Sequence, residues 1–147
     1  MAFRFTLDAV LRYRQALEER EQQRLGVLLA QRAALRDELQ QATDARLRLR
    51  LSIEQTLRQQ LTPAVEIHFA QMQEHGIEMR CDALRERLRK LQEGIAEQTA
   101  RYRQERQKRE VLDALRQVQL RNYRMVQQRR QQAALDELYL LRRREPS

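Results

Sequence analysis

The chain has 147 residues, of which 34% are charged and 5% aromatic, with no Trp. Its mean hydropathy of −0.84 excludes the broad core of a globular domain of this length. Only three Gly and two Pro interrupt a sequence rich in the good helix formers Ala, Leu, Gln, Glu and Arg. This composition predicts long helices whose apolar residues form a narrow seam.

A formal net charge of +8 would suit nucleic acid, an anionic membrane or an acidic protein surface. Almost all of the basic residues are Arg, and acidic residues are interleaved with them, as in residues 18–21. That interleaving is typical of the solvated face of a coiled coil. We therefore do not expect nucleic acid to be the main partner, although a basic helical hairpin that binds it stays open as an alternative.

Cys81 is the only cysteine, which excludes an intramolecular disulfide and suits a reducing compartment. Residues 1–14 lack the continuous apolar core of a signal peptide. No apolar run approaches the roughly 20 residues that would span a bilayer. We expect a soluble, cytoplasmic protein.

The first half of the chain carries a heptad seam and predicts a helix over about residues 5–59. Polar residues at Arg14, Glu18 and Glu21 interrupt this seam. Its apolar members are Leu7, Leu11, Leu25, Leu28, Leu35, Leu39, Ala42, Leu49 and Ile53.

A turn is expected over about residues 60–62, because Thr62 suits an N-cap and Pro63 suits the first turn of a helix. A second helix should then run over about residues 63–144. Its seam has a polar interruption at Gln98, Glu105 and Arg109. Its apolar members are Leu84, Leu88, Leu91, Ile95, Tyr102, Leu112, Tyr123 and Val126.

Folding the chain back at residue 61 brings together residues whose numbers add to about 122. Leu39 then meets Leu84, and the polar interruption of the first helix faces residues 101–108. The sequence therefore predicts an all-α protein: one antiparallel two-helix coiled-coil hairpin over residues 1–147, with a longer C-terminal helix.

The same arithmetic leaves residues 116–144 without an opposing segment, which is roughly 40 Å of helix. This overshoot keeps an apolar stripe and many Arg residues, so it should pack against a partner or a second copy. The stripe consists of Leu120, Tyr123, Ala134, Leu138 and Leu141.

No catalytic or cofactor motif is visible: the chain has no Gly-rich phosphate loop, no nucleophile elbow and no Cys pair. We expect neither an enzyme nor a small-molecule substrate. One group of possible metal ligands lacks a compact motif, so we expect no metal site. The group consists of His68, Glu74, His75, Glu78 and Cys81.

Three residues of the second helix, Phe69, Met72 and Met79, are candidates for an adaptable docking surface. Packing of Phe69 into the seam against Leu49 and Ile53 is the alternative.

Two terminal patterns resemble those of the FliJ family of bacterial flagellar export proteins. Residues 3–14 read FRFTLDAVLRYR and are followed by EERE at residues 18–21. Residues 131–138 read QQAALDEL and are followed by three Arg at residues 142–144. Ala133 and Ala134 stand where the family typically has a basic residue. The length and the two-helix plan also fit, so the resemblance covers essentially the whole chain.

The resemblance implies an accessory stalk of the flagellar type III protein export apparatus. Proteins of this family insert their paired termini into the central pore of the hexameric export ATPase FliI and promote its assembly and activity. They also engage the cytoplasmic domain of the export gate protein FlhA and handle export chaperones. Flagellum biogenesis, motility and chemotaxis depend on such an apparatus, which lies at the inner membrane, so a cytoplasmic, peripherally membrane-associated location is implied.

Carried onto this chain, the resemblance implies two sets of partner-binding residues. The gate would be bound by Phe69, Met72 and Met79. The ATPase ring would be bound by Phe3, Phe5, Leu7, Val10, Leu11, Arg12, Arg14, Asp136, Glu137, Leu138, Leu141, Arg142 and Arg143.

Three alternatives stay open. A stalk protein of a virulence injectisome, of the YscO kind, would share the architecture. A nucleic-acid-binding hairpin would lose binding steeply with salt, whereas ring insertion should depend on apolar residues such as Phe5 and Leu141. A purely structural coiled coil or homodimer would show a mass that depends on concentration.

Overall fold

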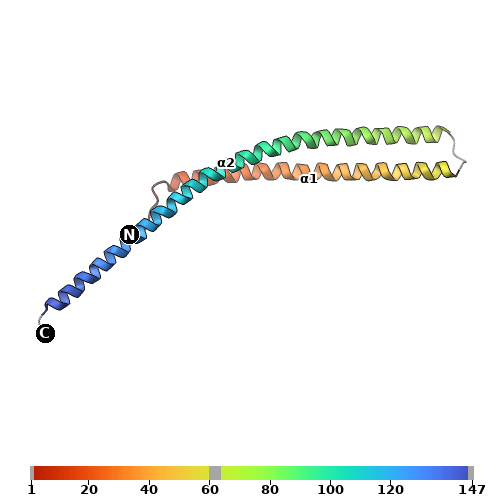
Figure 1. Ribbon diagram of the computed structural model, residues 1–147. Coiled ribbons are helices and arrows are strands. Elements are labelled where there is room, and N and C mark those ends of the chain that lie inside the picture. The colour runs from red at the N-terminus through yellow and green to blue at the C-terminus, as the bar shows by residue number, and fades with distance from the viewer. Residues whose placement is uncertain (1, 60–63, 146–147) are drawn as a thin grey trace. The chain divides into compact units, whose positions relative to one another are not determined.

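The computed structural model describes residues 2–59 and 64–145. These residues form two helices and no strand: α1 (Asp8–Arg58), of 51 residues, and α2 (Ala64–Arg144), of 81 residues (Figure 1). The all-α class and the longer second helix are therefore confirmed. The predicted turn at residues 60–62 and the start of the second helix at Pro63 lie outside the described residues. No described helix is both long and apolar enough to cross a membrane.

α1 begins at Asp8, three residues later than predicted. The backbone N–H of Asp8 donates to the carbonyl of Phe5 at 3.1 Å, which closes a turn ahead of the helix. The carboxylate of Asp8 also lies where the helix dipole favours negative charge. Phe5 is 7% exposed, so the non-helical start directs this ring into the protein.

The chain divides into two compact units. We call Glu21–Tyr102 the central unit, and we call Met1–Arg20 together with Arg103–Ser147 the terminal unit. Each unit contains a part of α1 and a part of α2. A single hairpin over the whole chain stays a prediction.

The core of the central unit lies between α1 and α2, whose parts in this unit run side by side in Figure 1. Cys81 is 1% exposed and Leu84 is 3% exposed, and both pack with Ala42 of α1. Leu39 packs against the same cluster, as the predicted approach of Leu39 to Leu84 requires. Cys81 therefore behaves as a small buried hydrophobe.

Ion pairs between the helices flank this core. Arg50 Nη2 lies 3.0 Å from Glu74 Oε1, and Arg46 lies 3.7 Å from carboxylate oxygens of both Glu74 and Glu78. The residue numbers in these pairs add to about 122, as expected for helices that fold back near residue 61. Two of the carboxylates considered as metal ligands are thus engaged by arginine.

A polar residue is buried in the same seam. Gln98 is 6% exposed, and its side-chain amide donates to the backbone carbonyl of Glu21 at 3.1 Å and to the Glu21 carboxylate. Both acceptors belong to α1. The polar interruptions of the two helices therefore meet here, so that a buried donor is satisfied.

The terminal unit contains a second polar layer. Arg109 donates two hydrogen bonds to the Glu18 carboxylate and one to Asp113, at 2.6 Å between Nη1 and Oδ2. Nearby, Arg14 Nη1 lies 3.7 Å from Glu105 Oε2. The hydrogen bonds from Arg109 to Glu18, and then to Asp113, raise the pKa of the guanidinium above its usual value. A raised pKa for a cation means that its contribution to stability persists as pH rises to strongly alkaline values.

Leu84→Ala should lower the free energy of unfolding by about 2–4 kcal/mol, because it leaves a cavity in the most buried part of the seam. Urea unfolding followed by circular dichroism would measure the change. Leu47→Ala is the matched control, since Leu47 is 57% exposed and should change stability by less than about 0.5 kcal/mol. Equal losses in the two variants would contradict a core at Leu84.

Arg109→Met should cost about 1–3 kcal/mol, because it leaves the Glu18 carboxylate partly buried without its donor. Arg106→Met is the control: the Arg106–Glu110 pair is more than half exposed on both sides, and its removal should cost at most about 0.5 kcal/mol. The same unfolding experiment tests both variants. A loss for Arg109→Met no larger than that of its control would show that the polar layer adds no stability.

Candidate protein-docking surface

The N-terminal segment of the terminal unit packs on α2. The ring of Phe3 lies against that of Tyr123, with centroids 5.6 Å apart, and Phe5 and Leu11 are buried. These three residues are predicted to contact an ATPase ring; in the structure Phe3 contacts α2, and Phe5 and Leu11 are not exposed. Among the other predicted contacts of this segment, Leu7 and Val10 are exposed.

The two basic residues predicted at this end differ in their surroundings. Arg12 is exposed and pairs with Asp8 at 3.0 Å. Arg14 is half-buried and faces Glu105. Arg12 is therefore the more accessible of the two for a partner.

The uncovered part of α2 begins later than predicted. Tyr123 and Gln127 are half-buried, and residues 128–145 are exposed without exception. The reason is that residues 2–5 are not helical. An extended chain advances about 3.3 Å per residue whereas a helix advances about 1.5 Å, so the N-terminal segment covers more of α2 than the helical estimate allowed.

The structure does not pair the two predicted terminal segments with each other. Phe3 lies on Tyr123, and Asp136 follows Tyr123 by 13 residues of the same helix. That separation is about 20 Å along α2. Residues 136–144 therefore lie beyond the reach of Phe3 in the described part of the chain.

We call residues 128–144 the C-terminal arm. It presents five large apolar side chains, each more than half exposed, directly before three consecutive Arg residues. We call these side chains the apolar patch, and so dense a set of exposed apolar residues on several sides of one helix indicates an interaction site. The five residues are Leu135, Leu138, Tyr139, Leu140 and Leu141.

Part of this patch continues the covered face of α2. Eleven residues make about three helical turns. Ala134 therefore lies on the same side of α2 as Tyr123, three turns further along the helix, and Leu138 has the same relation to Gln127. The N-terminal segment covers that side up to Tyr123, and nothing among the described residues covers it at Leu138. The C-terminal arm is thus a seam without its opposing segment.

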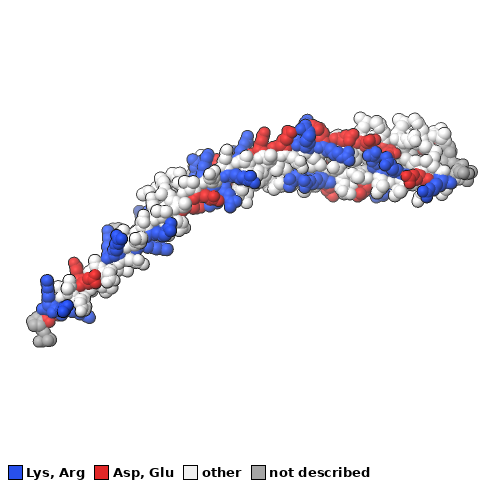
Figure 2. Space-filling model, viewed as in Figure 1, with Lys and Arg blue, Asp and Glu red and all other residues white. Residues whose placement is uncertain are grey.

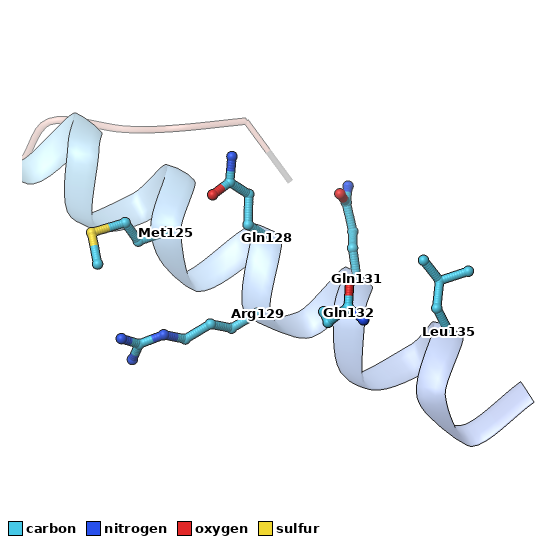
Figure 3. Close-up of a pocket in the computed structure, with 6 residues that line it drawn as sticks. All are labelled: Met125, Gln128, Arg129, Gln131, Gln132 and Leu135. Atoms are coloured by element: carbon cyan, nitrogen blue, oxygen red, sulfur yellow. The ribbon is translucent and has the colours of Figure 1, made fainter. Parts of the chain in front are cut away.

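A shallow hollow on the C-terminal arm does not amount to a small-molecule site. Figure 3 shows that its lining side chains, from Met125 to Leu135, all come from one helix. Small-molecule sites are enclosed clefts that bury most of their ligand. The surface therefore suits a macromolecular partner.

The positive charge is concentrated in the terminal unit. This unit has 16 Lys and Arg against 9 Asp and Glu, whereas the central unit has 13 against 12. The two signs are interleaved along the central unit, where Arg89 donates to Glu86 and lowers its pKa (Figure 2). An acidic partner surface would therefore be attracted to the terminal unit.

The second predicted surface lies in the central unit. Phe69 and Met72 are each 62% exposed and Met79 is 61% exposed, so Phe69 does not pack in the seam. The structure adds Val65, which is 78% exposed on the same helix. The spacing of four residues between Val65 and Phe69 was the sequence signal that could have revealed it.

Comparisons of the chain with protein-family models, with curated proteins and with solved structures gave no match.

Phe5→Ala should release the N-terminal segment from α2, because it removes the most buried side chain among the described residues that precede α1. Hydrogen–deuterium exchange at the Asp8 amide, which is bonded to the Phe5 carbonyl, should accelerate at least about tenfold. Val10→Ala is the control, because Val10 is 42% exposed. Unchanged exchange in Phe5→Ala would show that Phe5 is not the anchor.

Proposed function

We propose that this protein is an accessory stalk of a flagellar type III export apparatus, which inserts into the central pore of a hexameric export ATPase of the FliI kind and promotes its assembly and activity. The whole chain would act as an antiparallel coiled-coil hairpin. The observation that supports this proposal most is the C-terminal arm, a single helix that is apolar, basic and uncovered.

The dimensions of the C-terminal arm suit a narrow pore. A lone α-helix with side chains is about 10–12 Å across, less than a pair of helices. Insertion of the C-terminal arm alone therefore replaces the insertion of paired termini. Its apolar patch would supply the buried anchors, and Arg142 and Arg143 would pair with carboxylates of the ring.

The N-terminal residues would have a mixed role. Leu7, Val10 and Arg12 remain available for the ATPase ring, since each is exposed. Phe5 and Leu11 would act indirectly, by holding the covered part of α2 in place.

The remaining partners of the proposal follow the family resemblance. The cytoplasmic domain of the export gate FlhA would bind at Phe69, Met72 and Met79, and export chaperones would be handled by the same protein. It would be a cytoplasmic protein peripherally associated with the inner membrane at the export gate. The YscO-type stalk of an injectisome shares these features and is the nearest alternative.

Nucleic acid binding is the alternative from another class, and the charge of the terminal unit favours it. It predicts binding that falls steeply with salt and that depends on Arg rather than on Leu. A titration of double-stranded DNA at several salt concentrations would separate this function from ring insertion.

The test of the proposal is the rate of ATP hydrolysis by the cognate export ATPase with and without this protein. The full chain should stimulate the rate. A chain ending at Gln127, which keeps the contact between Phe3 and Tyr123, should not. Leu138→Glu should reduce stimulation at least about tenfold, because it places a charge in the apolar patch.

Leu51→Glu is the matched control for this experiment, because Leu51 is 50% exposed but lies in the central unit. It should leave stimulation unchanged. Circular dichroism would confirm that each variant keeps its helices. An ATPase that neither binds nor responds to the full chain would refute the stalk function, whereas equal effects of the two Glu variants would refute the role of the C-terminal arm.

A further inference from the structure

A second, complete heptad seam runs along α2 on the side that faces away from α1. Its members follow each other at alternating spacings of four and three residues, and all of them are exposed. Glu74 and Cys81, which contact α1, lie on the opposite side of the helix. The members of this outer seam are Val65, Phe69, Met72, Gly76, Met79 and Ala83.

We propose that a second copy of this chain packs on the outer seam in the antiparallel direction, with a two-fold axis between Met72 and Gly76. Phe69 then lies opposite Met79 of the second copy, and Met72 lies opposite its Gly76. Figure 2 shows a surface without Lys, Arg, Asp or Glu near the N-terminal end of α2. The outer seam includes Phe69, Met72 and Met79, which the proposed function gives to the export gate, so the two roles compete for one surface.

The sizes of the seam residues favour the antiparallel direction. Gly76 is exposed and has no side chain, and the space where a side chain would begin is open. In the antiparallel arrangement Met72 of the other copy packs over Gly76, and Val65 lies opposite the small Ala83. A parallel arrangement would place Gly76 opposite Gly76 and leave a gap in the seam.

The polar side chains beside the outer seam are also complementary to themselves. One flank carries Glu66 and Arg80, and the other carries His68 and Asp82, all exposed. In antiparallel pairing Glu66 faces Arg80 of the second copy, and His68 faces its Asp82. The two-fold axis repeats each pair, so that four favourable contacts specify the partner as this chain itself.

The outer seam spans 19 residues, or about 28 Å of helix, which is short for a coiled coil. The dimer should therefore be weak and visible only as a mass that rises with protein concentration. Sedimentation equilibrium of the full chain, followed up to about 200 µM, would measure its dissociation constant.

A charge exchange tests the register directly. Glu66→Arg and Arg80→Glu should each weaken the dimer about tenfold, because each replaces two attractive pairs by repulsive ones. The double variant should restore the dissociation constant to within about threefold of the unaltered chain. Residues 66 and 80 are about 21 Å apart on one helix, so compensation between them can occur only between copies.

Gly76→Glu provides a second test that cannot be confused with misfolding. The open space at Gly76 accommodates a side chain, and Glu is a better helix former than Gly, so the melting temperature should stay equal or rise. Dimerisation should be lost, because the carboxylate would face Met72 of the second copy.

Three results would overturn the inference. One is a chain that stays monomeric at every concentration. This result would count against the dimer even if the outer seam binds the export gate. Another is a dimer that neither Glu66→Arg nor Gly76→Glu weakens. The third is a dimer that only Leu138→Glu weakens, which would place self-association on the C-terminal arm. ATPase stimulation is measured separately and depends on the terminal unit, so it can fail or succeed without altering this outcome.

Discussion

Two helices in contact can bury only one face of each, and the rest of this structure depends on that constraint. Among the described residues the buried set is small and is spread along the chain: Phe5, Leu11, Ala42, Cys81, Leu84, Ile95 and Gln98. No position therefore holds a broad core that could support a cleft. Stability and recognition must both come from helix faces, and a face that lacks a covering segment is available to a partner.

The polar layers explain how so narrow a seam fixes its register. Gln98 is buried and satisfied by two acceptors of Glu21, and Arg109 is satisfied by Glu18 and Asp113. Sliding one helix by a heptad would separate these groups, and each buried polar group left without a partner costs about 1–3 kcal/mol. Apolar seam residues would tolerate the same slide far better. Specificity therefore resides in the polar layers, as it does for single polar residues in coiled coils.

Much of this fold follows from periodicity alone, because a heptad seam fixes which side of each helix is covered. Folding the chain back near residue 61 predicts that the polar interruptions of the two helices meet and that Leu39 approaches Leu84, and both contacts are present. It failed at the N-terminus, because it left α2 uncovered from residue 116, whereas Phe3 lies on Tyr123. It also could not show that Val65 and Phe69 belong to a second seam, because periodicity does not say which of two apolar faces meets α1.

Helicity of the C-terminal arm does not depend on a bound partner, which matters for its proposed role. Starting a helix is unfavourable, but extending one adds a hydrogen bond for each residue that is fixed. The C-terminal arm extends a helix that is already held by Tyr123 and by Arg109. Three Arg residues in its last turn also interact favourably with the helix dipole. Leu138 and Leu141 are therefore presented on a preformed surface, and docking avoids much of the ordering entropy that an unfolded tail would lose.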